Sequence, residues 1–369
     1  MTENERIREV KTATILRFTD IWRNNFQTNL PRIRENPGVA ALRNKFPGAP
    51  CIVIGAGPSL DKNIRYLPHV AGKAILIASD AALKPLLQHD VIPAFVVCLD
   101  PQAEIARFLA GVPHRGMTLV APSIVHPHVL NLWEESVVFY HKYAPDIPIL
   151  VEIQNSLPHI GVLTPGGSVL SVAYDLAFQI GGSPIMFIGQ DLSFPKKNIY
   201  TRGCEKEEDS LEHECAKQSE NIVFEENING VGVPTLKSLS VTRQWFNWAF
   251  TTWKREYPLE IYNCSEAGIL KDHCQIVPLR EAMHTRCTKK LNVAWTLKKA
   301  LERSGYAVHT VADGQMAVET AGRVGADLVL MDIKMPTVNG LEALSLLRQR
   351  HPETMVIVMT AFGSLQAAV

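Results

Sequence analysis

The segment at residues 51–61, Cys-Ile-Val-Ile-Gly-Ala-Gly-Pro-Ser-Leu-Asp, constrains the fold of this chain more than any other. Its first four residues are apolar and predict a buried strand, while Gly55 and Gly57 predict a sharp turn before a helix. Such a turn brings backbone N–H groups together with the positive end of a helix dipole, an arrangement that favours a phosphate or another anion. The segment therefore predicts a nucleotide-type α/β domain in the first half of the chain.

The composition limits the class of protein. The 369 residues suffice for two domains, and 37 basic residues balance 37 acidic ones, so no overall charge draws the chain to nucleic acid or anionic lipid. No apolar run is long enough for a membrane span, and the charged N-terminus does not resemble a signal peptide. Seven cysteines without a Cys-x-x-Cys pair, including Cys51 and Cys98 in apolar runs, are typical of buried thiols in a reducing compartment. We expect a cytoplasmic protein.

Apolar runs alternate with helical segments along most of the chain. Continuous apolar strands separated by helices predict an α/β fold, with a Rossmann-like, mostly parallel sheet and helices on both faces. A helix at 5–28, ended by Asn29-Leu-Pro31, is expected in an N-terminal helical segment at 1–47. The other expected helices are 81–88, 102–110 and 168–180, and the expected strands are 51–54, 74–78, 95–99, 118–121, 137–140 and 185–188.

Acidic residues follow several of these strands. Asp80 and Asp100 come after the second and third expected strands, and Asp191 comes after the sixth. In a parallel sheet these carboxylates gather at one edge with the glycine turn, where they can hold a ribose hydroxyl or a divalent cation. Asp80 has an alternative role as the cap of the next helix.

A second glycine turn, Thr164-Pro-Gly-Gly-Ser168, precedes an apolar helix. Gly166 and Gly167 leave N–H groups exposed and Ser168 is a candidate N-cap, so the segment is either a second phosphate cradle or a plain tight turn. Clustered acids, two glycine turns and no nucleophile–base pair favour a nucleotide-dependent transferase, in which positioning and electrostatics carry the reaction.

Two regions follow the last of these strands. Residues 192–236 are polar and predict a long loop or lid, with a solvated surface insertion as the alternative. A metal site at Cys204, His213 and Cys215 is a minor alternative there, because the spacing matches no standard zinc pattern. Residues 238–256 predict an amphipathic helix whose three tryptophans are more typical of a core or interface than of a sugar platform.

Six motifs follow one another within residues 15–285. They are Gly55-Ala-Gly-Pro-Ser-Leu60, Ser79-Asp80, Asp100-Pro101, Thr164-Pro-Gly-Gly-Ser168, Gly189-Gln-Asp191-Leu and Asn263-Cys-Ser-Glu-Ala-Gly268. Together they resemble the motility accessory factor glycosyltransferases, which share their core with the 6-hydroxymethylpterin pyrophosphokinase-like domain. The resemblance implies a Rossmann-like transferase domain at 48–285, with Asp100 and Asp191 as catalytic candidates. The nucleotide-binding candidates are then Gly55, Gly57, Ser59, Asp80, Gly166, Gly167, Ser168 and Glu266.

The resemblance implies one of two activities. Motility members move a nonulosonic acid from its CMP-activated form to flagellin serine or threonine, and pterin members move a pyrophosphoryl group from ATP. Magnesium can accompany either nucleotide. Where the family pattern is Ser-Glu-Gly-Gly, this chain has Ser265-Glu266-Ala267-Gly268, and the added methyl group is expected to crowd a backbone that approaches the ligand closely. The chain lacks the long flanking regions of large motility members, which leaves the acceptor open.

The C-terminal residues carry a different set of motifs: Asp327-Leu-Val-Leu-Met-Asp332-Ile-Lys-Met-Pro336, Asn339-Gly340 and Val356-Ile-Val-Met-Thr360-Ala361. They resemble a response-regulator receiver domain over residues 291–369. The resemblance implies that Asp332 accepts phosphate and Thr360 contacts it, with a histidine kinase as partner only if the receiver works.

Parts of a receiver are missing from this stretch. The chain passes from Thr288-Lys-Lys290 directly into a helix at 292–304, without the first strand and its magnesium-binding acidic pair, and it stops at Val369, before the last strand. The strands on either side of the missing one then lack a partner, and phosphoryl transfer to Asp332 lacks its cation. We therefore expect a truncated receiver that is not phosphorylated. The non-enzymatic alternative is a signalling protein that works through Asp332.

Overall fold

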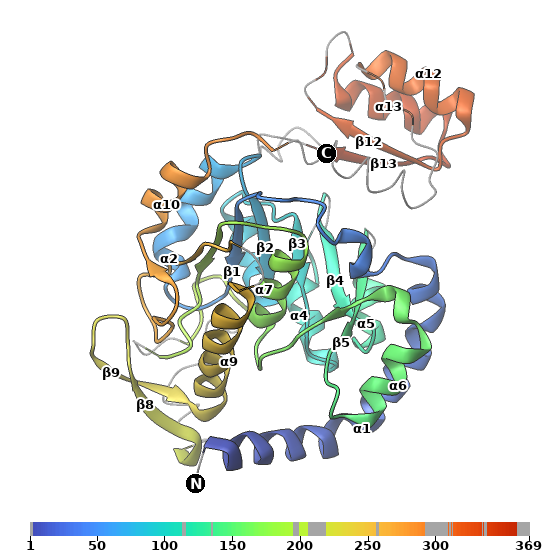
Figure 1. Ribbon diagram of the computed structural model, residues 1–369. Coiled ribbons are helices and arrows are strands. Elements are labelled where there is room, and N and C mark those ends of the chain that lie inside the picture. Colours follow the sequence, from blue (N-terminus) through green and yellow to red (C-terminus); the bar gives the residue numbers. More distant parts are fainter. Residues whose placement is uncertain are drawn as a thin grey trace.

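One nine-stranded sheet organises residues 51–276 (Figure 1). The structure is a computed structural model that describes residues 3–112, 116–133, 136–194, 199–205, 219–255, 258–291, 309, 311, 313–333, 335 and 338–359. The strand order is β11-β10-β7-β1-β2-β3-β4-β5-β6, and all neighbouring pairs are parallel, which confirms the predicted Rossmann-like α/β fold. The strands are β1 Cys51–Ile54, β2 Ile75–Ser79, β3 Phe95–Val97, β4 Thr118–Pro122, β5 Val137–Lys142, β6 Val162–Leu163, β7 Ile185–Ile188, β10 Ile261–Asn263 and β11 Gln275–Ile276.

Both faces of this sheet are buried. In β1, Ile52 and Ile54 join one apolar core, whereas Cys51 and Val53 join another on the opposite face, as the two-residue period of a strand requires. Every residue of β1, β2 and β7 is buried. Their sequences are therefore continuously apolar, and this property made them predictable.

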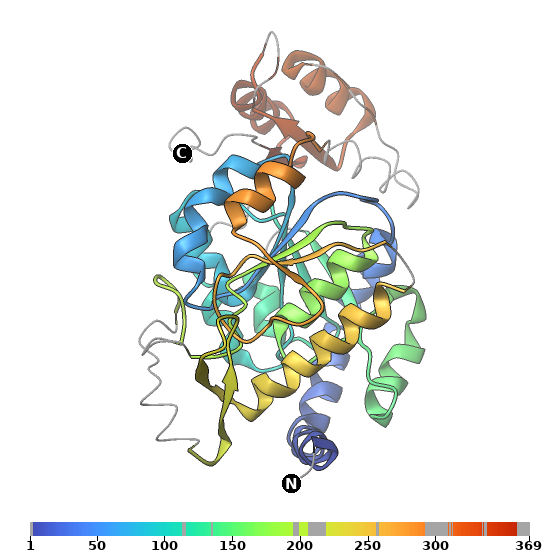
Figure 2. The same cartoon turned by 60° about the vertical axis from the view of Figure 1, so that its left-hand side comes forward.

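Helices cover the two faces separately. α7 and α9 lie side by side over one face (Figure 2), where Tyr174 stacks on Trp253 with ring centroids 5.0 Å apart, while α2, α3, α4, α5 and α10 cover the other. Within the described residues, none of the helices combines the length and apolar character of a membrane span. The α-helices are α1 Glu3–Glu35, α2 Leu60–Asn63, α3 Leu83–Gln88, α4 Ala106–Leu109, α5 Pro127–Leu132, α6 Pro148–Ser156, α7 Val169–Gln179, α9 Lys237–Trp253 and α10 Leu279–Arg286. The 3-10 helices are η1 Val39–Leu42, η2 Ile64–Val70, η3 Asp80–Ala82, η4 Ala103–Ile105, η5 Pro158–Ile160 and η6 Ser219–Asn221.

The N-terminal helix is longer than the sequence predicts. α1 continues through Pro31, so the expected break at 29–31 was wrong. Asn29 Nδ2 donates to Val125 O at 2.7 Å, and Arg32 Nη1 donates to a carbonyl of α5 at 2.7 Å. These bonds to the sheet domain hold the helix past a residue that lacks an N–H group.

The segment expected to be one long loop contains a hairpin. β8 Ile222–Glu226 pairs antiparallel with β9 Gly232–Leu236, which corrects the prediction of a loop over all of 192–236. Both strands are partly exposed, so they lack the continuous apolar runs that identified the other strands. His213 and Cys215 lie outside the described residues, and the metal alternative that includes them stays a prediction.

The sheet domain continues beyond the expected end at 285. Cys287 is buried, and its N–H donates to Met283 O at 2.9 Å. Leu291 N donates to Gly72 O at 2.7 Å. The segment after α10 therefore still belongs to this domain.

Where the structure describes the receiver-like residues, they form a small sheet with two helices. Val318, Ala343 and Leu347 are buried between them. Asp332 lies at the exposed end of its strand, whereas Thr360 and the helix expected at 292–304 lie outside the described residues. The elements are α12 Gly314–Val324, β12 Leu328–Asp332, α13 Gly340–Arg350 and β13 Met355–Met359, with β12 and β13 parallel.

Candidate functional site

Four neighbouring strands, β7, β1, β2 and β3, end at one edge of the sheet. The segments that follow them carry Asp191, the glycine turn at 55–59, Asp80 and Asp100. Asp191 therefore lies beside the glycine turn, and Asp100 lies two strands further along, about 10 Å at the usual strand spacing. The sheet topology gathers the predicted acids at one edge, as the sequence analysis expected.

The glycine turn after β1 lies against the segment after β7. A Cβ atom added at Gly55 would be 2.4 Å from the carbonyl oxygen of Gly189, so the absence of a side chain lets the two backbones meet. Gly55 N donates to Ile188 O at 2.8 Å, and Gly57 N donates to Gly189 O at 3.0 Å. These N–H groups are bonded within the protein, so the turn does not offer them freely to a phosphate.

The Asp191 carboxylate fills the inner side of this turn. Its Oδ2 accepts a hydrogen bond from Ser59 N at 2.9 Å and lies 2.7 Å from where a Cβ of Gly57 would be. Burial raises the pKa of Asp191 to about 6, and the nearby Ser59 hydroxyl together with the hydrogen bond from Ser59 N opposes that rise only in part. The chain therefore keeps a charge at neutral pH in a place where the charged form is disfavoured, which is typical of functional sites.

The backbone of Asp191 is held by the segment after β10. Gly268 has φ +83°, and a Cβ atom there would lie 2.1 Å from Asp191 O. Ile269 N donates to the same carbonyl oxygen at 3.0 Å. The close approach is thus made at Gly268, against the protein's own backbone, and not at Ala267, which is partly exposed. Glu266 also has a left-handed backbone, with φ +57°.

The second glycine turn lies under α9. A Cβ atom at Gly166 would lie 2.1 Å from Trp245 Cδ2, and one at Gly167, where φ is +97°, would lie 2.6 Å from Thr242 Oγ1. Gly166 N donates to Ser171 Oγ at 2.6 Å. These glycines therefore allow α9 to pack closely, in agreement with the tight-turn alternative.

A second buried carboxylate holds this turn from α7. Asp175 Oδ2 accepts from Thr164 N at 2.6 Å, and its Oδ1 accepts from Gln179 Nε2 at 2.9 Å. Burial raises the pKa of Asp175 to about 6, while both hydrogen bonds act against that rise. Both oxygens are occupied, unlike those of Asp191.

The other two predicted acids make short-range contacts. Asp80 is buried, and its Oδ1 accepts from Ala81 N at 2.8 Å. Asp100 is partly exposed, and its Oδ1 accepts from Gln102 N at 2.9 Å. The thiol of Cys98 lies near both: burial raises its pKa most, and the negative charges of Asp80 and Asp100 raise it further.

Several buried polar atoms at the ends of β7, β1 and β2, and at the start of α7, have no hydrogen-bond partner within the described part of the chain. We call them the inner polar group: Ser59 Oγ, Ser79 Oγ, Ser168 Oγ, Gln190 Nε2 and Asp191 Oδ1. Leu170 Cδ1, in the first turn of α7, lies 2.5 Å from the Cβ position of Gly55, so the start of α7, which carries Ser168, packs against the glycine turn. A buried polar atom without a partner costs about 1–3 kcal/mol, and groups left in this state often await a ligand or water.

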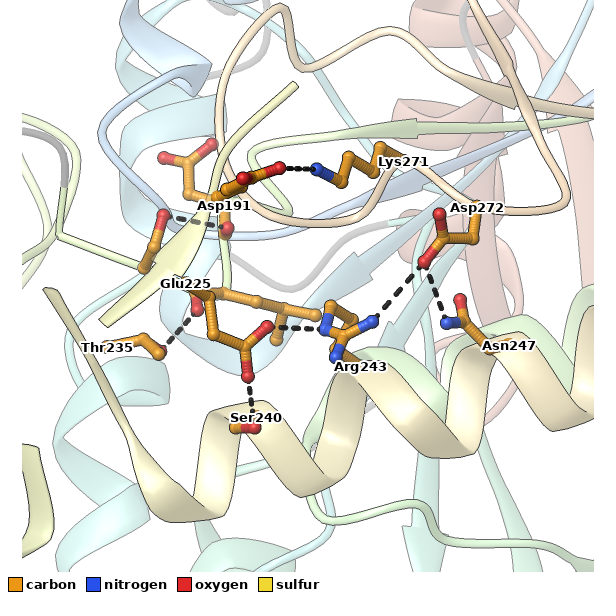
Figure 3. Close-up of polar contacts among 11 residues, drawn as sticks. Asp191, Glu225, Thr235, Ser240, Arg243, Asn247, Lys271 and Asp272 are labelled. Carbon is orange, nitrogen blue, oxygen red and sulfur yellow. Dashed lines mark hydrogen bonds and ion pairs between the residues drawn. The ribbon is translucent and has the colours of Figure 1, made fainter. Parts of the chain in front are cut away.

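The β8–β9 hairpin is fastened beside Asp191 by a polar network (Figure 3). Thr235 Oγ1 donates to Leu192 O at 2.6 Å, next to Asp191. Arg243 of α9 lies between Glu225 and Asp272, with N···O distances of 2.6 and 3.3 Å (Figure 3). The hairpin thereby connects α9 with the segments after β7 and β10 that hold Asp191 in place.

Sequence reasoning did not single out two members of the inner polar group. Ser79 and Gln190 each precede a predicted acid within a quoted motif. The available signal was a polar residue at the end of an apolar strand, the position from which parallel sheets bind ligands. Across the described ranges, no three His, Cys, Asp or Glu side chains gather as metal ligands.

Two family models match separate parts of the chain. Residues 24–197 match 6-hydroxymethylpterin diphosphokinase MptE-like proteins, and residues 291–369 match the response regulator receiver domain. The chain thus matches an MptE-like model followed by a receiver model, which confirms the resemblance drawn from the motifs.

Known proteins match parts of the chain. The structure of a MAf glycosyltransferase from Magnetospirillum magneticum AMB-1 aligns with a TM-score of 0.50 and 20% identity, over 72% of this chain and 40% of that one, and shows a shared fold. An uncharacterised protein of Treponema pallidum is 26% identical over 49% of this chain and 32% of its own length. The transcriptional regulator NtrC of Escherichia coli is 38% identical over 78 residues, which are 21% of this chain and 17% of NtrC. The chain spans less than half the length of each of these relatives.

Proposed function

We propose that this protein is a transferase that binds a nucleotide-activated donor at the edge formed by β7, β1 and β2. The observation that carries the proposal is the inner polar group: five buried atoms without protein partners within the described residues, at the edge where parallel sheets bind nucleotides. The match to a diphosphokinase-like family over residues 24–197 supports the same class of reaction.

The two predicted catalytic acids lie in different surroundings. Asp100 is partly exposed, so an acceptor hydroxyl can reach it, and we assign it the role of catalytic carboxylate. Asp191 is buried and bonded to Ser59 N, which favours a binding role. Gly55, Gly57 and Ser59 shape the turn around that carboxylate, and their contact with a nucleotide stays a prediction.

For the donor we propose a CMP-activated nonulosonic acid, with a flagellin-type protein hydroxyl as acceptor. The fold shared with a MAf glycosyltransferase supports this choice. The second candidate is diphosphoryl transfer from ATP to a pterin-like alcohol, which the MptE-like match favours. In either case we propose that magnesium accompanies the nucleotide phosphates.

A thermal-shift panel separates these candidates. CMP, CDP and ATP, each with and without magnesium, stabilise the folded chain in proportion to their binding. We expect selective stabilisation by CMP, and selective stabilisation by ATP with magnesium would support the diphosphokinase instead. Asp100→Asn is expected to abolish transfer while the shift with CMP persists. No response to any nucleotide would refute both candidates.

For the receiver-like residues we propose that Asp332 is not phosphorylated. The described part of this region contains one pair of strands, and its sequence lacks the acidic pair that binds magnesium in receivers. We therefore expect acetyl phosphate to leave the mass of the chain unchanged. We also expect beryllofluoride to leave its spectroscopic signals unchanged. A stable phosphorylated species at Asp332 would favour the signalling alternative and a histidine kinase partner.

A further inference from the structure

We propose that the inner polar group recognises an uncharged, hydroxyl-bearing part of the donor, the ribose or the transferred sugar, and that the phosphate does not bind in the glycine turn beside Asp191. The proposal rests on the function proposed above and names which part of the donor this edge holds. It reverses the expectation, drawn from the glycine motif, that the turn cradles a phosphate.

The first argument concerns the charge inside the turn. The Asp191 carboxylate lies where a Cβ of Gly57 would be, with its Oδ2 at 2.7 Å, and it takes the N–H of Ser59. A phosphate in the same place would meet a buried like charge and would find the N–H groups of Gly57 and Ser59 already bonded. Repulsion between like charges is strong in such surroundings because little water screens it.

The second argument concerns the atoms left without partners. The inner polar group offers three hydroxyls, one amide donor and one carboxylate acceptor, and none of its members is a cation. Lys62, a nearby positive charge that lowers the pKa of Asp191, has an exposed side chain. A sugar hydroxyl both donates and accepts, so it matches this set: it can donate to an acceptor such as Asp191 Oδ1 or accept from a donor such as Gln190 Nε2. A buried phosphate needs cations or several free N–H groups.

The sign of one substitution tests the proposal. Asp191→Asn retains an oxygen for Ser59 N and removes the charge. If a ribose hydroxyl donates to Asp191, the dissociation constant of CMP rises at least tenfold, because a hydrogen bond to a charged acceptor is lost. If a phosphate lies in the turn, the same substitution removes repulsion and CMP binds more tightly. Tighter binding would overturn the proposal.

Two further ligands identify the source of the hydroxyl. If it belongs to the ribose, Asp191→Asn weakens CMP but leaves 2′,3′-dideoxy-CMP unchanged. If it belongs to the transferred sugar, the substitution leaves CMP unchanged and weakens CMP-N-acetylneuraminate. Equal weakening of CMP and its dideoxy analogue, or no change with any ligand, would overturn the proposal.

Matched variants complete the design, with dissociation constants measured by calorimetry on the full chain. Asp100→Asn makes the same change at the same edge, two strands from the turn, and is expected to affect CMP and its dideoxy analogue equally. Ser59→Ala removes a hydroxyl beside the Asp191 carboxylate and retains the N–H to Asp191, so it serves if Asp191→Asn does not fold. It too should weaken the hydroxyl-bearing ligand selectively. If the wild type binds no nucleotide, the proposed function fails; if it binds CMP and Asp191→Asn binds CMP more tightly, only this inference fails.

Discussion

Two halves of one sheet edge differ in how their polar groups are satisfied. Beyond β3, β4 and β5, Asn25 Nδ2 donates to Pro101 O at 2.8 Å and to Ile124 O at 3.0 Å. His141 bonds to the Ser123 hydroxyl at 3.0 Å and, through its other ring nitrogen, to a backbone carbonyl at 2.9 Å. These polar side chains are engaged by the protein itself, and their bonds fix α1 and two loops to the sheet, although Trp22 Nε1 of α1 has no hydrogen-bond partner within the described residues.

Beyond β7, β1 and β2, the inner polar group has no such partners within the described residues. One of its members, Asp191, is a buried carboxylate whose pKa burial raises to about 6. Proteins keep unsatisfied groups and strained charges mainly where function needs them, and satisfy the rest. The comparison indicates that the first half mainly supports the fold, with Asp100 after β3 at its border, and that the second half binds the donor.

The largest expected effect lies in the supporting half. Asn25→Ala removes two hydrogen bonds and leaves the carbonyls of Pro101 and Ile124 without a donor in a buried place, so we expect a loss of about 3 kcal/mol in the free energy of unfolding. Urea unfolding measures it. The adjacent Asn24 is exposed on the same helix, and Asn24→Ala should change stability by less than about 0.5 kcal/mol. Equal effects of the two substitutions would contradict the division of the edge.

The next effect lies in the binding half. Gly57→Ala places a methyl group 2.7 Å from both Asp191 Oδ2 and Gly189 O, so the carboxylate or the backbone must move. We expect a loss of about 2 kcal/mol in stability and of the thermal shift caused by nucleotide. Gly232→Ala is the control, since a Cβ there meets nothing within 4 Å. If the Gly57→Ala chain keeps both its stability and its thermal shift with nucleotide, the turn has space for a methyl group.

A smaller effect, with the opposite sign, is expected at Asp191. Because its pKa is raised from 3.8 to about 6, the folded chain holds a proton that the unfolded chain releases between those values, and wild-type stability falls as pH rises through that window. Asp191→Asn carries no such charge, so it should be more stable than wild type by about 1–2 kcal/mol at pH 8 and equal to it below pH 4.

Asp175→Asn is the matched control for that gain. Asp175 is also buried with its pKa raised to about 6, but Thr164 N and Gln179 Nε2 both donate to it, and an asparagine can accept only one of them. We expect Asp175→Asn to be less stable than Asp191→Asn by about 1–2 kcal/mol at pH 8. Chemical denaturation at pH 4 and pH 8 measures both variants. Identical curves would show that the free oxygen of Asp191 has no energetic consequence.

The sequence predicted this edge as a place but not its internal contacts. Continuous apolar runs such as 51–54 and 185–188 identify central parallel strands, and parallel strands must end together, so Asp191 and the glycine turn were expected at one edge. Which group a glycine makes room for is decided by tertiary contacts. Gly57 makes room for Asp191, which is 134 positions away, and no local pattern encodes that distance.

The same limit explains the errors in the secondary structure. Pro31 lies within α1 because side chains of that helix, among them Asn29, bond to loops about a hundred residues away. The β8–β9 hairpin was missed because its partly exposed strands are held by polar bonds, such as that between Ser240 and Glu225, and not by apolar burial. Local propensity is a weak guide wherever such contacts decide the outcome.

The smallest expected effect concerns His141, in the supporting half. Leu157 O can only accept, so His141 Nε2 carries the proton and Nδ1 accepts from the Ser123 hydroxyl, which makes the neutral ring the bonded form. Burial lowers the pKa of His141 below 6.5, so the unfolded chain binds the proton first as pH falls. The stabilisation is therefore complete above about pH 7 and is lost as pH falls through 6.5 toward the folded-state pKa.

This acid loss runs opposite to the trend expected from Asp191, so one pH series of urea midpoints distinguishes the two halves. His141→Gln should flatten the fall between pH 7.5 and pH 5.5, whereas His69→Gln, at an exposed histidine, should leave it unchanged. A fall that persists in His141→Gln would move the acid-sensitive group elsewhere and weaken the assignment of this half to stability. If the fall in stability disappears in His141→Gln, the acid response belongs to the Ser123–His141 pair. The opposite pH dependence of stability that we expect from Asp191 can then be measured alone in the His141→Gln chain.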